Sequence, residues 1–422
     1  MNVLVFTTLF PNNVWPNHGV FVKERVAHVA RSDERAVRVV APVPYCPPFS
    51  LGGRQRFSRV VPHEVIEGLP VSHPRFFMTP KIGMTLYGLM MFLSVLPAMR
   101  RIRREFAFDL IDAHYVYPDG LAAVLLGRYF RCPVVVSARG SDINLFATLP
   151  LIRPLLRFTL RRADRVVAVS GALKEAIAAL GIPAERISVI PNGVDAQKFR
   201  PVPQADARQA LGLPADRPVV LSVGGMNPVK GFDLLLRAFR LTLDGQIRRP
   251  YLVIVGDGAE RTALEAQASA LDLRGDVRFA GSVPHLELYQ WYSAADVFCL
   301  ASRREGWPNV VLEALACGVP VVSTEVGGVP EIVTSETLGL LVTRDERALA
   351  AGIVRALGTT WQGRAIVEHA RARSWEGVAG AVLDTFDSLF DRTSGSHHSA
   401  PSGPRLSDAG QRSIAALNQR TR

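Results

Sequence analysis

The stretch "EGWPNVVLEALACGVPVV", residues 305–322, places Glu305 in a Gly-Trp-Pro-Asn turn and a second acidic residue, Glu313, eight positions later in an apolar segment. Pro308 fits the first turn of a helix but not its interior, and Gly318 is a typical helix end. The sequence therefore predicts a helix over residues 309–317. Such an apolar helix is buried on most sides, and a buried carboxylate is costly unless it is hydrogen-bonded. Glu313 either faces one solvated strip or is held there for a ligand hydroxyl, and this stretch alone leaves both open.

The size, composition and charge of the chain set broad limits on its function. Its 422 residues, 48% of them hydrophobic, are enough for two domains with cores of ordinary size. The formal net charge of +11 favours an anionic partner: nucleic acid, a phosphorylated ligand or an anionic membrane face. Because the basic residues are not interleaved with an aromatic platform, we expect no nucleic-acid partner.

The cysteines and the N-terminal residues predict a cytoplasmic protein. Cys46, Cys132, Cys299 and Cys317 are scattered without metal-type spacing, which is typical of reduced thiols in a cytoplasmic chain. The opening "MNVLVFTTLFPNN" has no basic region and only a short apolar run, so it predicts a first core strand rather than a signal peptide.

Short runs of β-branched residues alternate with segments of helical length, which is the pattern of parallel sheets flanked by helices. In the first half we predict strands at 3–7, 37–41, 110–113, 134–137, 165–169 and 188–190, and helices at 19–31, 119–130 and 171–181. A second series of strands lies in "PVVLSVGG", "YLVIVGDG", "DVRFAGSV", "ADVFCLAS", "GVPVVST" and "GLLVT". The sequence therefore predicts an α/β protein of two doubly wound, Rossmann-like domains that face each other.

Changes in composition predict where these domains end. Residues 199–218 are rich in proline and carry only one short helical pattern, as expected of an interdomain connection. We place the first domain at 1–199, the second at 200–375, and a helix at 376–392 that crosses back to the first domain. Residues 393–422 are polar with Ser, Gly and Pro, and we expect them to be disordered.

An uncharged segment at 82–99 is followed by Arg100, Arg101, Arg103 and Arg104. Its length is borderline for a bilayer span, and a span there would disrupt the first sheet. A core helix and an apolar surface helix both remain open. Four closely spaced arginines favour the surface helix, which would bind anionic lipid headgroups. We therefore predict that 81–104 attaches the protein peripherally to the inner face of the cell membrane.

The loops that follow strands are where open α/β sheets bind their ligands. After "PVVLSVGG" come Lys230 and Gly231, just before a helix whose free amides and nearby ammonium suit a phosphate group. Residues 309–311 offer a second helix start of this kind. Gly19 opens a helix after the first strand, where it either forms a simple turn or lets a ligand approach the backbone.

Two further strand ends carry polar side chains. His114 follows "DLIDA" directly, which places an imidazole at the binding edge of the sheet or makes it a satisfied structural residue. Arg139 and Asp142 follow "VVVS" and either form an internal salt bridge or serve a ligand.

Several common catalytic signatures are absent from the sequence. It has no Asp-x-Asp, no His/Cys cluster, no GxSxG, no complete GxGxxG and no GxxxxGK[ST]. These absences argue against a metal-clamped diphosphate site, a serine hydrolase, a dinucleotide dehydrogenase and a P-loop enzyme, so no metal and no cofactor are expected.

Taken in order, these segments resemble one family. Glu305 and Glu313 form an E-x7-E pattern similar to the signature of glycosyltransferase family 4, retaining enzymes of the GT-B fold. The similarity extends over about 380 residues, through Gly19, "DAHYVYPDG", "ARGSDI", "VVAVSGALKEAI", "VIPNGVDAQKF", "VGGMNPVKGFD" and "VGDG". Within the family the chain most resembles bacterial exopolysaccharide and lipid-linked oligosaccharide transferases, including the teichuronic-acid type.

The resemblance implies a role for each matching residue. Glu313 would hold the ribose hydroxyls of a nucleotide and Glu305 the hydroxyls of the transferred sugar. Lys230 and the Gly19 amide would hold phosphate, and His114 would contact the donor sugar. The remaining donor-binding positions implied are Gly225, Asn309, Val310 and Val311, with Arg278 and Ser282 in the segment that usually lies against the base. His114, Glu305 and Lys230 would be the catalytic residues.

The chain departs from the family pattern at two positions. The family often has Arg where this chain has Gly225, so Lys230 would carry more of the phosphate charge alone. Many members have His where this chain has Arg139, which with Asp142 would instead bind an anionic acceptor or a donor carboxylate.

The function implied is transfer of a sugar from a nucleotide-diphosphate donor to a lipid-linked or polysaccharide acceptor in envelope or exopolysaccharide synthesis. The resemblance implies same-face attack, with the leaving phosphate taking the acceptor's proton. A GT-B nucleotide-sugar 2-epimerase and a non-catalytic sugar-nucleotide-binding module are the alternatives. The donor sugar, the base, the acceptor and the oligomeric state do not follow from these residues.

Overall fold

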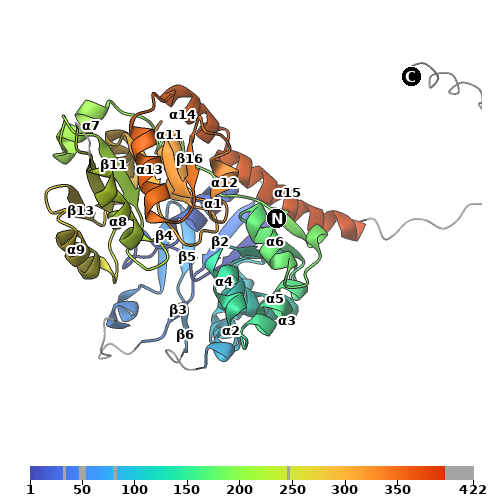
Figure 1. Ribbon diagram of the computed structural model, residues 1–422. Helices are drawn as coiled ribbons and strands as arrows, with labels where there is room; N and C mark the ends of the chain where they lie inside the picture. Colours follow the sequence, from blue (N-terminus) through green and yellow to red (C-terminus); the bar gives the residue numbers. More distant parts are fainter. Residues whose placement is uncertain (32–34, 47–53, 79–82, 245–247, 395–422) are drawn as a thin grey trace, which may run out of the picture.

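Runs of largely buried β-branched residues form two large sheets (Figure 1), and β3 and β6 form a small third sheet. The computed structural model describes residues 1–31, 35–46, 54–78, 83–244 and 248–394. The first sheet has eight strands in the order β10-β9-β8-β7-β1-β2-β5-β4, and the second has six in the order β13-β12-β11-β14-β15-β16. All neighbouring pairs are parallel except β4 and β5, as expected for strands linked by crossing helices.

The elements of the first domain match the predicted ones closely. Its strands are β1 (Asn2–Phe6), β2 (Ala36–Val40), β3 (Val43–Pro44), β4 (His63–Ile66), β5 (Leu69–Ser72), β6 (Arg75–Phe76), β7 (Leu110–His114), β8 (Val134–Ala138), β9 (Arg165–Ala168) and β10 (Ile187–Val189). Its helices are α1 (Val20–Ala30), α2 (Tyr87–Glu105), α3 (Leu121–Phe130), α4 (Ser141–Asn144), α5 (Arg153–Arg162) and α6 (Gly171–Ala178), with short turns η1 (Arg54–Arg59), η2 (Met84–Leu86), η3 (Val116–Gly120), η4 (Phe146–Thr148) and η5 (Ala184–Arg186). The sequence analysis missed β3 to β6.

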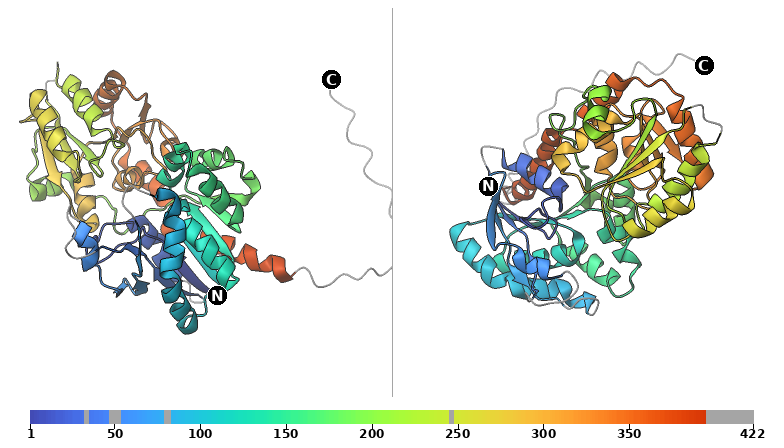
Figure 2. Two further views of the ribbon diagram at one scale, coloured as in Figure 1. Left: turned by 90° about the horizontal axis from the view of Figure 1, so that it is seen from below. Right: turned by 90° about the vertical axis from the view of Figure 1, so that its left-hand side faces the viewer.

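The second domain repeats the alternation of strand and helix. Its strands are β11 (Val219–Val223), β12 (Tyr251–Val255), β13 (Val277–Gly281), β14 (Val297–Leu300), β15 (Val321–Thr324) and β16 (Gly339–Val342). Its helices are α7 (Gln204–Leu211), α8 (Phe232–Thr242), α9 (Arg261–Ala270), α10 (Leu288–Ala294), α11 (Asn309–Ala316), α12 (Val329–Ile332), α13 (Glu346–Leu357) and α14 (Gly363–Arg371), with the turn η6 (His285–Glu287). Figure 2 shows the two sheets in separate halves of the molecule.

The strand order places the candidate loops at two switch points. β1 lies between β2 and β7, and β11 lies between β12 and β14, so consecutive connections leave in opposite directions there. Ligands of open parallel sheets bind in the crevice beside such a point, at the carboxyl ends of the strands. The loops after β1, β11 and β14 carry Gly19, Lys230 and Glu305, and His114 is the last residue of β7.

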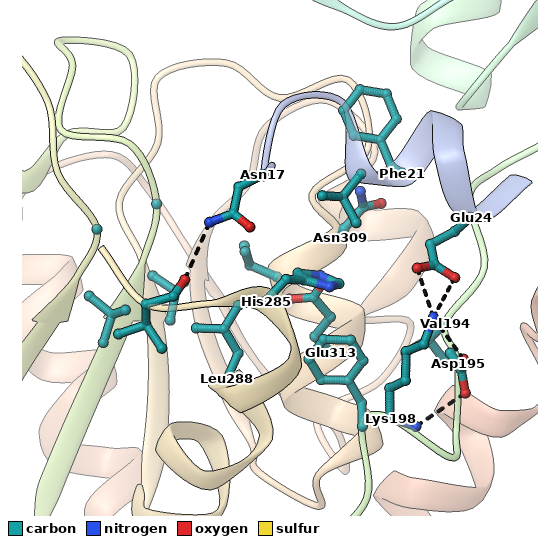
Figure 3. A pocket seen from close by; sticks show the side chains of 18 of the residues that line it. Asn17, Phe21, Glu24, Val194, Asp195, Lys198, His285, Leu288, Asn309 and Glu313 are labelled. Carbon is teal, nitrogen blue, oxygen red and sulfur yellow. Dashed lines mark hydrogen bonds and ion pairs between the residues drawn. The ribbon is translucent and has the colours of Figure 1, made fainter. Parts of the chain in front are cut away.

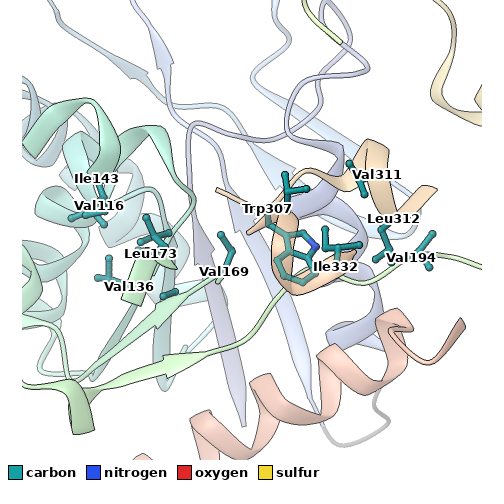
Figure 4. Close-up of a cluster of buried hydrophobic side chains, with 14 of the residues drawn as sticks. Val116, Val136, Ile143, Val169, Leu173, Val194, Trp307, Val311, Leu312 and Ile332 are labelled. Carbon is teal, nitrogen blue, oxygen red and sulfur yellow. The ribbon is translucent and has the colours of Figure 1, made fainter. Parts of the chain in front are cut away.

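Apolar side chains join the two domains. Buried residues of the first domain, among them Val169 and Leu173, continue into Trp307, Val311 and Ile332 of the second within one cluster (Figure 4). The sheets therefore do not rely on the connecting chain alone to face each other.

The last described helix, α15 (Trp375–Ser394), returns to the first domain. Val378, Ala379, Val382 and Phe386 are buried among residues of β1, α1 and β2. Just before α15, Ser374 pairs with Val194 in a parallel bridge, so the two crossings between the domains lie side by side. Of the tail predicted at 393–422, residues 395–422 lie outside the described residues.

Helix α2 combines the two interpretations of the uncharged segment. Met91, Val95 and Met99 pack in the core of the first domain, whereas Leu89 and Leu93 are exposed, Leu93 by 57%. Residues 81 and 82 of this prediction lie outside the described residues. Among the helices that the structure describes, none combines the length and hydrophobicity that a bilayer span requires.

We expect Phe386→Ala to destabilise the first domain, although Phe386 lies at the other end of the chain. Its side chain is fully buried, and removing a buried phenylalanine typically lowers the free energy of unfolding by about 3–5 kcal/mol. A clear fall in the melting temperature relative to wild type checks this. The exposed Asp384→Ala on the same helix serves as the control, and equal melting temperatures for both variants would contradict the packing of α15.

Candidate functional site

Helix α11 carries the carboxylate that the sequence singles out. The helix begins at Asn309, after the loop that follows β14, and its apolar residues, among them Leu312 and Leu315, pack into the core. Glu313 does not face bulk solvent. Its side chain lines a cavity of about 420 Å³ between the two domains, which we name the first lobe.

Two side chains of the second domain hold the Glu313 carboxylate. The Tyr292 hydroxyl donates to Oε2 at 2.8 Å. Nε2 of His285, which lies beside Glu313 in Figure 3, is 3.1 Å from Oε1. Burial, with the Glu313 charge added, raises the pKa of Tyr292 well above its ordinary value, so the hydroxyl stays a donor. Burial acts to lower the pKa of His285, but the Glu313 hydrogen bond and charge outweigh it and raise that pKa. The buried charge is therefore compensated by the protein itself.

The sequence analysis did not find these two partners of Glu313. His285 and Tyr292 lie in "PHLELYQWYS", which contains no motif and no unusual spacing. Only the turn η6 and helix α10 bring them beneath α11, so no local signal could have identified them.

Both domains build the first lobe. The first domain contributes Asn17, Gly19, Phe21 and Glu24, and the second contributes Gly225, Ser282, His285, Asn309, Val310 and Glu313, among others. At Gly19 the backbone has φ +64°, and a Cβ atom would lie 2.3 Å from the carbonyl oxygen of Leu9. Only glycine fits there, and the chain can turn into α1 beside the cavity.

An ion-pair cluster lies at the first-domain side of the first lobe. Nζ of Lys198 donates to both carboxylate oxygens of Glu24 at 2.8 Å and lies 3.3 Å from Oδ2 of Asp195 (Figure 3). Burial acts to raise the pKa of Glu24, but Lys198 and Lys23 outweigh it and lower that pKa. Glu24 thus stays ionised in the lining of the lobe. The sequence analysis did not predict this cluster.

A second cavity of about 510 Å³ adjoins the first, and we name it the second lobe. The two lobes share Phe21, Asn309 and Val310, so they form one cleft. Nζ of Lys230 lies 2.8 Å from Oε1 of Glu305, and Oγ of Ser302 donates to the same oxygen at 2.6 Å. The structure therefore brings Lys230 and Glu305, from two different loops, into direct contact.

The backbones of the two domains meet beside the second lobe. A Cβ atom at Gly306 would lie 2.3 Å from the carbonyl oxygen of Arg139, and one at Gly140 would lie 2.8 Å from the Cα atom of Gly306. Glycine at both positions permits this approach, which any side chain would prevent.

The structure bears on two alternatives that the sequence left open in the first domain. His114 is fully buried and is absent from the described lining of both lobes, because its ring nitrogens are taken by Asp112 and Arg139. Arg139 and Asp142 do not form a side-chain salt bridge within the described residues. The Asp142 carboxylate accepts from the backbone amides of Val116, Arg139 and Gly140, whereas the Arg139 guanidinium points to His114 and Asn192.

The other predicted positions divide between cleft and core. Gly19, Gly225, Ser282 and Glu313 line the first lobe, Lys230, Glu305 and Arg139 line the second, and Asn309 and Val310 line both. Val311 is fully buried, and Arg278 donates to the carbonyl oxygen of Leu211 at 2.7 Å; neither is among the described lining residues. In the part of the chain that the structure describes, no group of three or more His, Cys, Asp and Glu side chains could hold a metal ion.

Sequence comparisons find similarity to glycosyltransferases in both domains. The description "Glycosyltransferase Family 4" matches residues 37–198, and "Glycosyl transferases group 1" matches residues 203–373. The chain is 30% identical to TuaC of Bacillus subtilis (strain 168), provisionally described as a teichuronic acid biosynthesis glycosyltransferase, over 93% of this chain and 95% of TuaC. It is 35% identical to a D-inositol 3-phosphate glycosyltransferase of Thermobispora bispora over 57% of this chain and 59% of that protein.

Comparisons of structure show the same fold. The sucrose-phosphate synthase of Thermosynechococcus elongatus superposes with a TM-score of 0.77 at 23% identity, covering 93% of this chain and 99% of that one. HepE of Anabaena, solved with UDP-glucose, gives a TM-score of 0.68 at 23% identity, covering 92% and 99%. The fold is GT-B, as predicted. With two domains matched and TuaC similar over nearly its whole length, the chain belongs to glycosyltransferase family 4.

Proposed function

We propose that this enzyme transfers a sugar from a nucleoside-diphosphate donor to a lipid-linked or glycan acceptor in bacterial envelope polysaccharide synthesis, with retention of configuration and without a metal. The observation that carries the proposal is the cleft itself. Its first lobe holds a buried carboxylate on α11, and its adjoining second lobe holds a carboxylate paired with a lysine. HepE, which has the same fold, was solved with UDP-glucose.

In this proposal the nucleoside occupies the first lobe. Ribose hydroxyls donate to the ionised Glu313, and each such charge-assisted hydrogen bond contributes about 1.5–3 kcal/mol. Tyr292 and His285 hold the carboxylate in place, so it needs little reorganisation when the ligand enters. Gly19 and Gly225 leave the adjoining backbone open to the ligand.

The diphosphate then lies where the lobes meet, and the transferred sugar lies in the second lobe. Cleavage of the glycosidic bond builds negative charge on the leaving oxygen and positive charge on the sugar ring. Lys230 and the first amides of α11 stabilise the leaving oxygen, and the Glu305 carboxylate stabilises the ring. The acceptor attacks from the same face, and the leaving phosphate takes its proton.

We further propose that the first domain docks on an anionic membrane, where a lipid-linked acceptor resides. Helices α2, α3 and α5 are neighbours and expose Leu89, Leu93, Tyr129 and Phe158. Exposed arginines lie around them: Arg100, Arg101, Arg104, Arg128, Arg153, Arg157, Arg161 and Arg162. Apolar side chains surrounded by cations suit insertion between anionic headgroups.

Nucleotide binding is the first test of the donor site. A thermal-shift panel of UDP, GDP, ADP and their sugars should show stabilisation by at least one of them, because a ligand specific for the folded state raises the melting temperature.

Glu313→Gln removes the negative charge to which the ribose hydroxyls donate, and it should weaken nucleotide binding about tenfold or more. The exposed Glu325→Gln is the matched control. Equal binding by both variants would contradict the role of Glu313.

Measurements of kcat test the role that we propose for Glu305 in the second lobe. Glu305→Gln should lower kcat roughly 100-fold or more while the affinity for the free nucleotide changes little, because Glu305 acts on charge that develops in the transition state. Glu325→Gln again serves as the control. Conversion of a nucleotide-sugar to its isomer with no need for an acceptor would overturn the transferase proposal in favour of an epimerase.

Vesicle cosedimentation tests membrane docking. Wild type should bind phosphatidylglycerol vesicles, and binding should weaken as salt rises because exposed charges are screened. Leu89→Ser/Leu93→Ser and Arg101→Ser/Arg104→Ser should each reduce the bound fraction. Arg347→Ser/Val354→Ser, which changes exposed residues of α13 in the second domain, should not. Salt-independent behaviour with no vesicle binding would contradict the docking surface.

A further inference from the structure

Arg139 reaches the second lobe from the end of β8, at the point where the family resemblance leads one to expect histidine. Its guanidinium donates from Nη1 to Oδ1 of Asn192 at 3.0 Å and from Nη2 to Nδ1 of His114. The ring of Phe21, which lines both lobes, lies 5.6 Å from the guanidinium carbon. Three neighbours therefore fix the orientation of this side chain.

The buried His114 acts as a fixed acceptor for Arg139. Burial opposes ionisation of Asp112, but its contact with His114 and the charge of Arg25 outweigh burial and lower the Asp112 pKa to about 2, so Asp112 only accepts. Burial, with the charges of Arg139 and Arg25, lowers the pKa of His114 to about 3. The neutral ring therefore donates from Nε2 to Asp112 at 3.1 Å and presents the Nδ1 lone pair to Arg139.

This arrangement leaves donors of Arg139 without an acceptor. Its Nε atom is buried and has no hydrogen-bond partner among the described residues, and the same holds for Nε and Nη2 of Arg25 behind it. Burial and the charge of Arg25 lower the pKa of Arg139 to about 9, so its own surroundings disfavour its charge. Asp142 is close, but its oxygens accept from three backbone amides. Nε is shielded from the lobe, but Nη1 and Nη2 each carry a second N–H beside the one given to Asn192 or His114. An anion in the lobe would accept from these two groups and compensate the guanidinium charge.

The second lobe as a whole is cationic. Arg139, Lys230 and Arg304 line it, and Glu305 is the one carboxylate among its described lining residues. Glu305 is already paired with Lys230, and in the proposed function Lys230 faces the diphosphate. Arg139 and Arg304 then remain for negative charge on the sugar side of the cleft. Of the two, Arg139 is the one held rigidly, and its planar fork matches a carboxylate.

We propose that Arg139 makes the second lobe selective for a sugar that carries a carboxylate, a hexuronic acid supplied by the donor or by the acceptor. The inference rests on the proposed function, because it assigns the sugar class to the cleft described there. His114 is a positioning residue in this scheme, which accounts for its burial away from the cavity.

The test compares matched charged and neutral ligands by calorimetry. The donor arm titrates UDP-glucuronate against UDP-glucose and GDP-mannuronate against GDP-mannose. The acceptor arm titrates methyl glucuronide against methyl glucoside, without and with saturating UDP or GDP. Wild type should prefer the carboxylate roughly 10- to 100-fold in one arm, as expected for a charge-assisted bidentate contact.

Two substitutions of Arg139 are compared, and nucleotide binding by each variant shows that it is folded. Arg139→Gln and Arg139→His, the latter restoring the residue common in the family, should both reduce the preference to about one while the affinity for UDP or GDP alone is kept. Arg304→Gln, which removes the other arginine among the described lining residues of the second lobe, should retain most of the preference. No carboxylate preference in either arm with wild type, or an unchanged preference in both Arg139 variants, would overturn the proposal. Failure of UDP and GDP to bind at all would instead count against the proposed function, and the acceptor arm without nucleotide would still decide on Arg139.

Discussion

The contact between Gly306 and the chain at Arg139 and Gly140 is the constraint on which the cleft depends. It lets the carboxyl edges of two sheets, from different domains, come together without an intervening side chain. Two charged groups of the second lobe lie beside this contact, because Glu305 precedes Gly306 and Arg139 precedes Gly140. Asp142 accepts from the backbone amides of Arg139 and Gly140 and so holds that loop. A bulkier residue at either position would separate Arg139 from Glu305 and Lys230, and the lobe would no longer be one cavity.

The two lobes of the cleft differ in the sign of the charged side chains that line them. The first lobe is lined by Glu24, Glu313 and further acids, which suit a ligand rich in hydroxyl donors. The charged residues that line the second lobe are mainly cations, which suit phosphate and other anions. Glu313 and Glu305 are both already hydrogen-bonded to the protein. A ligand that binds either carboxylate therefore adds to its present hydrogen bonds or replaces one of them. It does not neutralise a charge that had no partner before.

The sequence predicted the fold in outline because its signals are local. The apolar strands of both domains and helix α11 are visible as continuous runs, and each is observed within about two residues of its prediction. The hairpin β4–β5 was missed because both strands are only four residues long, β4 alternates between exposed and partly buried residues, and β5 contains a proline. The partners of Glu313 and the pairing of Glu24 with Lys198 were missed for another reason. They depend on contacts between residues far apart in sequence, which one sequence does not reveal. His114 illustrates the same limit: its location at the sheet edge could be predicted, but its contacts with Asp112 and Arg139, which leave it buried, could not.

The parallel bridge between Val194 and Ser374 joins the two segments of chain that cross between the domains, so that they form one hinge. Two strands of chain that cross together allow rotation about one axis far more readily than twisting or sliding. Val194 and Trp375, beside this axis, line the first lobe, and Asn192, two residues before Val194, lines the second. The crossing that joins the domains is therefore itself part of the cleft wall. A change in the angle between the domains and a change in the shape of the cleft are for that reason one and the same movement.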